Sequence, residues 1–446
     1  MTSEPWHSVI LAAGLGTRMK SARPKVVHAI AGRTLVAHVA AAAVAAGADR
    51  VAVVIGPDMD EVRTALAPLA RHARYFTQSE RLGTAHAALA ARPALAEAGG
   101  DVIILYGDTP LLRPETLIRL RARLGEGAAV AILGFEAANP HGYGRLLLDG
   151  DGGVTAIHEE KDASDAERAI RLCNSGVMAF RGGLVLPLLE RIGNANAKGE
   201  FYLTDAVEIA RGLGHRVAVE ICPEDEVMGV NDRVQLARAE ALMQARLREA
   251  AMLAGATLTA PETVTFSYDT QLGRDVVVEP NVFFGRAVTV ADNAVIKANS
   301  YMEEVRIREG ASIGPFARLR PGADIGEGAR IGNFVEIKKA VVEAGAKIGH
   351  LSYIGDARVG ARANIGAGTI VCNYDGFRKT VTDIGEGAFV GSNTALVSPV
   401  KIGDGAYIGT GSVITRDVEP GALAIERSEQ KQISGWVERK KAKQQK

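Results

Sequence analysis

Residues 307–337 read IREGASIGPFARLRPGADIGEGARIGNFVEI, and an aliphatic residue returns in this stretch at every sixth position. An α-helix repeats its apolar face about every 3.6 residues, so this period excludes a helix. The period is typical of a parallel β-helix, in which each six-residue unit forms one flat side and points its aliphatic residue into the core. The residues in phase are Ile307, Ile313, Leu319, Ile325, Ile331 and Ile337.

The same period continues to residue 414, with two five-residue units and one large interruption. After Val371 the next residue in phase is Ile384, and the segment between them contains Cys372–Lys379. A solenoid expels extra residues as an external loop, often on its functional face. A left-handed helix of this kind has three flat sides and usually packs as a trimer, so we expect a homotrimer. The further residues in phase are Val342, Ile348, Ile354, Val359, Ile365, Val371, Ile384, Val390, Leu396, Ile402, Ile408 and Ile414.

Before the repeat, residues 8–230 alternate short apolar runs with helical patterns. Such alternation predicts a Rossmann-like α/β domain with a mixed, largely parallel sheet, whose ligand sites lie at the carboxyl ends of the strands. The runs expected to be strands are Ser8–Ala13, Arg50–Ile55, Val102–Tyr106 and Ala128–Phe135. The stretches expected to be helices are Thr34–Ala46, Asp60–Ala70, Thr84–Ala91 and Pro114–Leu124.

Residues 232–253 show a third pattern, rich in Ala, Leu, Arg and Glu and free of Gly and Pro, which predicts one rigid connecting helix. The sequence therefore predicts three parts. An α/β domain covers 1–230, a linker helix covers 231–253, and a left-handed parallel β-helix covers 254–446.

Net charge, the first residues and the cysteines indicate which partners and which compartment to expect. The formal net charge is zero, so bulk electrostatics favour neither nucleic acid nor an anionic membrane as a partner. The first residues, MTSEPWHS, lack the basic start of a signal peptide, and the apolar run Val36–Ala46 is too short to span a bilayer. We therefore expect a cytoplasmic protein. Its basic C-terminal tail is expected to be a solvated end, and its cysteines are too far apart in sequence to suggest a metal site: Cys173, Cys222 and Cys372.

A glycine loop, Leu11–Met19, follows the first expected strand directly. Its two glycines let the backbone close on phosphate oxygens. A dinucleotide fingerprint would need a third glycine where Met19 stands, and a P-loop would need Gly-Lys-Ser/Thr. Arg18 and Lys25 add two cations within reach of the same phosphates, which favours triphosphate binding over a plain strand-to-helix turn.

Two further residues are candidates on chemical grounds. Asp108 follows the apolar strand Val102–Tyr106, where a ligand for a hard cation belongs, although a strand-end Asp is also a common turn former. His350 lies two residues after Ile348 and therefore off the core register. Histidine suits a general base, although a lone histidine is more often a surface residue.

The motif LAAGLGTRM followed by Pro24-Lys25 resembles the signature of sugar-1-phosphate nucleotidyltransferases. The likeness continues in order with Gln78, Leu82-Gly83-Thr84, Tyr106-Gly107-Asp108, Gly142–Arg145, Glu159–Lys161, Asn174–Gly176 and Gly229–Asn231. With the β-helix behind it, the chain from about Val9 to Arg427 resembles the bifunctional bacterial N-acetylglucosamine-1-phosphate uridylyltransferase/glucosamine-1-phosphate acetyltransferase family.

The resemblance implies a nucleotide site and a metal site in the first domain. Arg18 and Lys25 would act on the phosphates, and Asp108 and Asn231 would hold Mg²⁺. Gln78 and Gly83 would contact the uracil, and Gly144, Glu159 and Asn174 the sugar. The implied set for UTP and its sugar product is Leu11, Ala12, Ala13, Gly14, Lys25, Gln78, Gly83, Thr84, Tyr106, Gly107, Asp108, Gly144, Glu159, Asn174 and Asn231. One departure is Leu15, where relatives often carry lysine.

The resemblance also implies an acetyl-transfer site in the β-helix. His350 would be the general base. The acceptor glucosamine 1-phosphate would be bound by Arg320, Lys338, Tyr353 and Asn364. Acetyl-CoA would contact Ala367, Asn373, Tyr374, Ser392, Thr410 and Arg427.

Taken together, these implications predict acetyl transfer from acetyl-CoA to glucosamine 1-phosphate, and then uridylyl transfer from UTP to the acetylated product. One alternative is a nucleotidyltransferase with a single activity and a purely structural β-helix. That alternative leaves His350, Lys338, Arg320 and Tyr374 without a reason to occur together. Another alternative is a regulatory or exchange-factor subunit, which need not keep Arg18, Lys25, Asp108 and Asn231 together.

Overall fold

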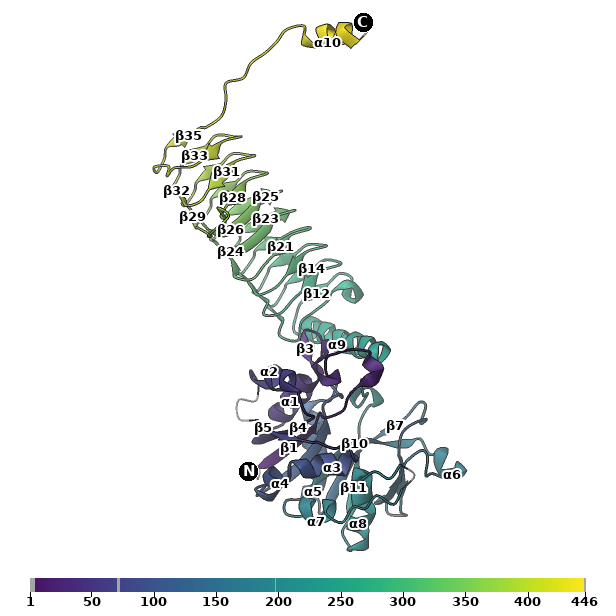
Figure 1. Ribbon diagram of the computed structural model, residues 1–446. Coiled ribbons are helices and arrows are strands. Elements are labelled where there is room, and N and C mark those ends of the chain that lie inside the picture. Colours follow the sequence, from purple (N-terminus) through teal and green to yellow (C-terminus); the bar gives the residue numbers. More distant parts are fainter. Residues whose placement is uncertain (1–4, 70–72, 197, 445–446) are drawn as a thin grey trace. The chain divides into compact units, whose positions relative to one another are not determined.

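The structure is a computed structural model that describes residues 5–69, 73–196 and 198–444 of the 446-residue chain (Figure 1). The chain divides into two compact units, residues 1–244 and 245–446. The boundary falls inside a single long helix, α9 (Arg233–Leu253). The expected fold class is confirmed, since an α/β unit with a mixed sheet is followed by a long helix and a parallel β-helix. The finer division at 230 and 253 stays a prediction.

The first unit is built on a mixed sheet with the strand order β11-β7-β10-β6-β1-β4-β5. β10 runs antiparallel to both β6 and β7, while β1, β4, β5 and β6 are parallel to one another. The strands of this order are β1 (Trp6–Leu11), β4 (Arg50–Ile55), β5 (Arg74–Thr77), β6 (Asp101–Tyr106), β7 (Val130–Glu136), β10 (Leu172–Phe180) and β11 (Val217–Ile221). The hairpin strands β8 (Arg145–Leu148) and β9 (Val154–His158) extend the same sheet through β10. The small pair β2 (Ala29–Ile30) and β3 (Arg33–Thr34) forms a separate sheet.

Helices cover both faces of this sheet (Figure 1). Because neighbouring residues of a strand point to opposite faces, Val9 packs with one group of helices and Ile10 with the other. One face is covered by α1 (Leu35–Ala45), α2 (Asp60–Leu66) and α5 (Pro114–Gly125). The other face is covered by α3 (Thr84–Ala90), α4 (Arg92–Ala96), α7 (Val185–Leu189) and α8 (Ala206–Gly212).

The expected strands and helices of this unit are confirmed, with shifted ends. The strand expected at Ser8–Ala13 is β1, which ends at Leu11 because the next residues turn into the glycine loop. The helix expected at Asp60–Ala70 ends at Leu66 in α2, and Ala70 itself lies outside the described residues. The remaining short elements are α6 (Asp165–Arg168), η1 (Thr17–Met19), η2 (Lys25–Val27), η3 (Leu203–Asp205) and η4 (Glu224–Glu226).

The long helix α9 begins at Arg233, one residue later than expected. Asp232 precedes it as a cap, since the Gln235 backbone N–H donates to Oδ1 of Asp232 at 2.8 Å. In its first half, Ala239 packs in a small buried cluster of the first unit. In its second half, Leu247 and Ala251 pack against the core of the β-helix. Both units therefore contribute to fixing this helix.

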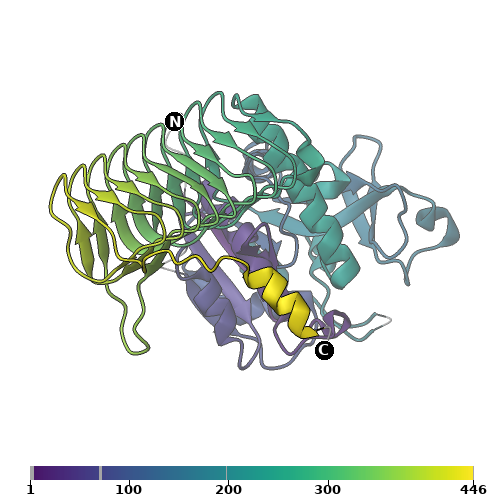
Figure 2. The ribbon, with the colours of Figure 1, turned by 90° about the horizontal axis from the view of Figure 1, so that it is seen from above.

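The second unit is a parallel β-helix of stacked coils (Figure 2). Every residue predicted to be in phase is confirmed as core, since the most exposed of them, Ile414, is only 5% exposed. One side of the coils is formed by β12 (Thr257–Leu258), β14 (Val277–Val278), β17 (Val295–Ile296), β20 (Ser312–Ile313), β23 (Arg330–Asn333), β25 (Lys347–His350), β27 (Asn364–Ile365), β30 (Phe389–Val390), β33 (Tyr407–Ile408) and β35 (Leu423–Ala424).

The other two sides share one sheet, because β24 (Glu336–Val342) and β26 (Tyr353–Val359) continue around a corner. One of these sides contains β15 (Phe283–Phe284), β18 (Tyr301–Met302), β21 (Arg318–Leu319), β28 (Ile370–Cys372), β31 (Ala395–Val397) and β34 (Val413–Ile414). The other contains β13 (Gln271–Leu272), β16 (Thr289–Val290), β19 (Val305–Ile307), β22 (Ala323–Ile325), β29 (Thr382–Ile384) and β32 (Val400–Ile402), and a short η5 (Pro261–Thr263) lies in the first coil.

The coils begin well before residue 307, where the sequence pattern first becomes regular. In these early coils aromatic and sulfur-containing residues take core positions that aliphatic residues hold later. Phe266 and Phe284 are buried and stack with their ring centroids 5.1 Å apart, and Met302 is fully buried. The aliphatic repeat is therefore less uniform in these coils than after residue 307.

The interruption between Val371 and Ile384 forms the expected external loop, which protrudes from the stack (Figure 2). Tyr374 and Lys379 form an antiparallel bridge across the loop. The carboxylate of Asp375 accepts hydrogen bonds from the backbone N–H groups of Phe377 (2.8 Å) and Arg378 (2.7 Å). The loop is thus locally ordered, although the Phe377 side chain is 95% exposed.

At the C-terminal end, α10 (Trp436–Gln444) is exposed along its whole length, as expected for a solvated basic tail. Its basic residues are Arg439, Lys440, Lys441 and Lys443, and Lys446 lies outside the described residues. None of the helices in the described ranges combines the length and apolar character needed to cross a membrane.

Two candidate active sites

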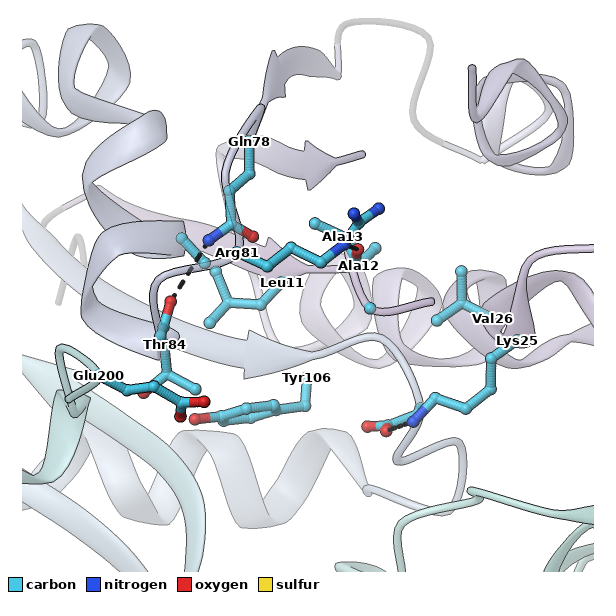
Figure 3. A pocket seen from close by; sticks show the side chains of 14 residues that line it. Leu11, Ala12, Ala13, Lys25, Val26, Gln78, Arg81, Thr84, Tyr106 and Glu200 are labelled. Atoms are coloured by element: carbon cyan, nitrogen blue, oxygen red, sulfur yellow. Dashed lines mark hydrogen bonds and ion pairs between the residues drawn. The ribbon is translucent and has the colours of Figure 1, made fainter. Parts of the chain in front are cut away.

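A cavity of about 250 Å³ lies at the carboxyl ends of β1 and β6, which are neighbouring parallel strands (Figure 3). This edge of an α/β sheet is where ligands usually bind. The structure brings together here Leu11, Ala12, Ala13, Gly14, Lys25, Gln78, Gly83, Thr84, Tyr106 and Asp108. The cavity is also lined by four residues that the sequence analysis missed: Val26, Arg81, Ala87 and Glu200.

The glycine loop is packed closely against the segment that carries Lys25. Gly16 has a φ of +63°, and a Cβ at this position would lie 2.4 Å from the Lys25 Cβ. Only glycine therefore fits both the backbone conformation and the space. Arg18 follows on η1 with an exposed side chain and is not part of the cavity lining.

The two predicted metal ligands meet at one cation, the ammonium group of Lys25. Its Nζ donates to Oδ2 of Asp108 and, at 2.9 Å, to Oδ1 of Asn231. Asp108 and Asn231, which are far apart in sequence, thus direct their oxygens to a single point. Hard oxygen donors of this kind suit Mg²⁺, which commonly takes one or two protein ligands and completes its shell with water and phosphate. The pair fits such a site. Within the described ranges no cluster of three or more His, Cys, Asp or Glu side chains offers an all-protein metal site.

The end of the cavity where Gln78 and Gly83 lie is held by a second segment of chain. Gln78 is buried, and its Nε2 donates to the Gly83 carbonyl at 3.3 Å. Gly83 has a φ of +122°, and a Cβ there would lie 2.4 Å from the carbonyl oxygen of Phe201. The Phe201 N–H donates to the Leu82 carbonyl at 2.8 Å. Gly83 is thus clamped in place by the backbone around Phe201.

The three residues expected to hold the sugar lie close together: Gly144 directly precedes β8, Glu159 directly follows β9, and Asn174 is in β10. The Asn174 N–H donates to the Gly144 carbonyl at 2.8 Å, and a Cβ on Gly144 would lie 3.4 Å from Oε1 of Glu159. Burial raises the pKa of Glu159. Burial also raises the pKa of Tyr106, whose ring lies against Gly176. Tyr106, which lines the cavity, thus lies next to this group of residues.

Not all predicted nucleotide residues line the cavity itself. As far as the structure describes the chain, its lining excludes Arg18, Gly107, Gly144, Glu159, Asn174 and Asn231. Gly107 instead ties two strands together, since its N–H donates to the Leu11 carbonyl at 3.0 Å. Asn231 reaches the site only through its contact with Lys25.

In the β-helix, His350 lies at the end of β25, at a corner of the coil. Ile348 is in register with Ile365 on the next coil, and the register continues through Val390 and Ile408. Two residues after each of these core positions, the same corner is occupied on successive coils by His350, Ala367, Ser392 and Thr410. We call these four residues the corner column.

Backbone hydrogen bonds continue along the corner column. The carbonyl of Ala367 accepts from the Asn393 N–H at 2.7 Å, and the carbonyl of Ser392 accepts from the Gly411 N–H at 2.8 Å. At the end of the column, Nη1 of Arg427 donates to the Thr410 carbonyl at 2.7 Å. The predicted base and four predicted acetyl-CoA contacts therefore form one continuous surface strip.

The imidazole of His350 is exposed and oriented by a neighbouring coil. Its Nδ1 contacts Oδ1 of Asn333, a residue that pairs with His350 in the strand register. An amide oxygen accepts a hydrogen bond, so this contact places the proton on Nδ1 and leaves the Nε2 lone pair free. That is the tautomer that a general base requires. The sequence analysis missed Asn333, because the contact depends on the stacking of two coils.

The predicted acceptor-binding cations are stacked on adjacent coils. Leu319 pairs with Ile337, so the residues that follow them, Arg320 and Lys338, occupy the same outward position. The ammonium of Lys379, on the external loop, lies beside Lys338 and lowers its pKa. Arg320 also contributes to that lowering and is held by Glu336 at 2.7 Å. Such a concentration of positive charge suits a phosphate group.

The other predicted residues of this site are spread over two sides of the coil. Tyr353 begins β26, on the same side as Lys338, and its hydroxyl lies against Gly355. Asn364 lies on β27, on the side that ends in the corner column. The Asn373 amide donates to the carboxylate of Asp356, and the Tyr374 side chain is exposed on the loop.

Comparison with known proteins identifies relatives for both units. The family described as "MobA-like NTP transferase domain" matches residues 8–167, and "Bacterial transferase hexapeptide (six repeats)" matches residues 304–339 and 382–416. The β-helix is accordingly left-handed. Proteins named "Bifunctional protein GlmU" from Azorhizobium caulinodans and Xanthobacter autotrophicus are each 60% identical over 96% of this chain and 96% of their own length. One from Paramagnetospirillum magneticum is 55% identical over 100% of this chain and 98% of its own length.

Proposed function

The chain belongs to the family of bifunctional GlmU proteins, and on that premise we propose how its residues divide two reactions. It is a bifunctional transferase. It transfers an acetyl group from acetyl-CoA to glucosamine 1-phosphate, and a uridylyl group from UTP to N-acetylglucosamine 1-phosphate with release of pyrophosphate. The first unit carries the uridylyl transfer and the β-helix carries the acetyl transfer.

In uridylyl transfer, a phosphate oxygen of the sugar attacks the α-phosphorus of UTP and pyrophosphate leaves. The work of the protein is to position the two substrates and neutralise charge. Gln78 and Gly83 hold the uracil edge, because their polar groups converge at one end of the cavity. Gly144, Glu159 and Asn174 hold the sugar next to Tyr106.

The phosphates lie between the glycine loop and Lys25, with Arg18 at the mouth of the loop. Asp108 and Asn231 hold Mg²⁺, which when bound supplies positive charge to the reacting phosphates. Support for this assignment comes from the convergence of both oxygens on the Lys25 ammonium. For the metal and the triphosphate to enter, the lysine must exchange its carboxylate partner for phosphate oxygens.

In acetyl transfer, the amine of glucosamine 1-phosphate attacks the thioester carbonyl of acetyl-CoA. A nitrogen–carbon bond forms, the carbon–sulfur bond breaks and CoA leaves as the thiol. His350 accepts the excess proton of the amine at Nε2, because Asn333 keeps the other proton on Nδ1. Arg320 and Lys338 bind the sugar phosphate, and Tyr353 and Asn364 complete the acceptor pocket.

Acetyl-CoA lies along the corner column, which leads from His350 to Arg427. Ala367, Ser392 and Thr410 contact it through their backbone groups or small side chains, and Asn373 and Tyr374 of the loop cover it. We further propose a homotrimer located in the cytoplasm, with small-molecule substrates alone as its binding partners besides its own copies.

The single observation that carries the proposal is that Lys25, Asp108 and Asn231 meet beside the glycine loop, while His350 heads the corner column in the other unit. Its test is a pair of substitutions in the full-length protein, with pyrophosphate release and thiol release measured on each. Asp108→Asn should lower pyrophosphate release by on the order of a hundredfold and leave thiol release intact. His350→Ala should do the reverse, losing about a hundredfold or more of thiol release.

Each activity serves as the folding control for the other. Undiminished pyrophosphate release in Asp108→Asn would contradict the metal assignment. Undiminished thiol release in His350→Ala would contradict the base assignment and would favour a structural β-helix attached to a nucleotidyltransferase of single activity.

A further inference from the structure

The lining of the nucleotide cavity contains a cation, Arg81, to which the proposed reaction has assigned no part. A nucleoside triphosphate carries about four negative charges near neutral pH, and an anion of this kind needs closely placed cations. The ammonium of Lys25 is already bonded to Asp108 and Asn231. Leu15, which lies in the glycine loop with its side chain 59% exposed, contributes no charge. Arg18 is on η1, outside the lining of the cavity.

Arg81 is the remaining cation of the cavity lining (Figure 3). Its Nε donates to the carbonyl oxygen of Ala13, in the glycine loop, at 2.9 Å. Its Nη2 lies close to Gly56, where a Cβ would come within 2.9 Å of it. Gly56 therefore leaves room for the guanidinium at the carboxyl end of β4. The side chain reaches across from the segment before Leu82 to the phosphate-binding side of the sheet.

This position leaves donors of Arg81 available to a ligand. Within the part of the chain that the structure describes, no carboxylate is paired with Arg81. Other exposed arginines of this unit do pair with carboxylates, as Arg23 does with Glu61 at 3.0 Å. A guanidinium has five N–H donors in a fixed plane, and one of them is used by Ala13. The others match the spacing of phosphate oxygens.

We propose that Arg81 binds the phosphates of the nucleotide and supplies the positive charge that Leu15 does not. This proposal rests on the uridylyl transfer proposed above. The bond to Ala13 has a second consequence, because it ties the arginine to the loop whose N–H groups face the same phosphates. Arg81 thus binds the phosphates and also anchors the glycine loop through its hydrogen bond to Ala13.

The test is titration calorimetry on the full-length protein with UTP, UDP and uridine, in the presence of Mg²⁺. Arg81→Gln should weaken the binding of UTP tenfold or more, since a hydrogen bond between charged groups is lost. The binding of uridine, which has no phosphate, should change less than twofold. Arg92→Gln is the matched control, since Arg92 is also on this unit, is exposed and pairs with Glu190 at 2.5 Å away from the cavity. It should leave both affinities unchanged.

A second variant separates charge from loop anchoring. Leu15→Lys places a new cation on the loop but cannot replace the bond from Arg81 to Ala13. In the Arg81→Gln background it should restore most of the lost UTP affinity. Uridine affinity, which the first unit itself provides, should stay near the wild-type level in every variant, which confirms that this unit is folded.

Three results would overturn the proposal. They are an unchanged UTP affinity in Arg81→Gln, an equal loss for UTP and uridine, and no recovery on adding Leu15→Lys. Failure of the wild-type protein to bind UTP at all would instead overturn the proposed uridylyl transfer, so the two failures are distinguishable.

Discussion

The side-chain amide of Asn333 orients the imidazole of His350 at the corner of the β-helix. Asn333 contacts Nδ1 of His350 from the preceding coil and selects the tautomer with Nε2 free. Asn333→Ala should therefore lower the kcat of acetyl transfer about tenfold with little change in KM for either substrate, because orientation is lost and binding is not. Steady-state thiol release measures both parameters.

The variant Asn333→Asp distinguishes orientation from simple packing. A carboxylate at this position keeps the hydrogen bond but favours the protonated imidazolium. The acid limb of the pH–rate profile for acetyl transfer should therefore move to higher pH than in the wild type. An unchanged pH–rate profile in Asn333→Asp, together with full activity in Asn333→Ala, would show that Asn333 does not position His350.

A second prediction concerns Asp205, at the end of η3 in the first unit. Burial, and then the carboxylates of Glu208 and Glu159, raise its pKa from 3.8 to about 6. A folded-state pKa above the unfolded value favours the native state at low pH, and this contribution is lost as the pH rises toward 6. The ionised carboxylate therefore costs stability at neutral pH.

Asp205→Asn removes that cost because the amide never ionises. The midpoint of thermal unfolding should rise by a few degrees at about pH 7.5, and the gain should vanish near pH 4. Scanning calorimetry at both pH values measures the difference. A gain of the same size at both would mean that ionisation of Asp205 is not its cause.

Sequence motifs alone pick out cavity residues that lie in one segment with a strand end or a loop, such as Lys25, Gln78 and Asp108. The motifs do not pick out Arg81, Glu200, Lys379 and Asn333. Each of these reaches its site from a neighbouring segment or coil, and the contact is created by tertiary packing. No local pattern of residue types records such a contact.

At the scale of elements, the β-helix was predictable because its core repeats every six residues regardless of the surrounding sequence. The repeat is less regular in the early coils, because Phe266, Phe284 and Met302 take core positions there that aliphatic residues hold later. In the first unit, β8, β9 and β10 were missed. They form a partly antiparallel region of the sheet, so their sequences do not follow the βα alternation that indicated β1, β4, β6 and β7.

The stack depends on each of its core residues, and Ile348 provides a test. Its side chain is fully buried between the paired residues Ile331 and Ile365. Ile348→Ala should lower the free energy of unfolding of the β-helix by about 2–5 kcal/mol, because it leaves a cavity that closed coils cannot fill. Denaturant unfolding of the full-length chain, followed by circular dichroism, measures the loss.

The matched control is Ile370→Ala, the same substitution on the outer surface of a coil. Ile370 is 49% exposed, so the change should be within about 0.5 kcal/mol. Equal losses in the two variants would show that side-chain burial in the core does not set the stability of the stack.

At the scale of the whole molecule, the surface of the β-helix suggests how copies associate. Phe316, Phe334 and Leu351 form an exposed apolar ladder along one corner of three successive coils, with exposed fractions of 47%, 54% and 63%. All three have positive φ values, which non-glycine residues rarely adopt. Apolar surface of this kind is usually covered by another chain.

We therefore expect the protein in solution to have three times the 46.9 kDa mass of one chain. Light scattering coupled to size exclusion measures this mass directly. Replacing Phe334 with Asp should lower it, because the ladder would then place a charge in the interface. A wild-type mass equal to that of one chain would contradict the trimer.

The register of the coils has a consequence for how the protein responds to force. Ile348 and Ile365 are paired neighbours, so one coil there consumes 17 residues. A coil is bonded only to the coils directly before and after it, and an end coil to just one. If the C-terminus is pulled away along the stack, coils should peel off one after another, each releasing about 5–6 nm of extended chain. A single-molecule force trace of this protein would then show a regular series of small steps from the β-helix, and its step length would measure the coil perimeter.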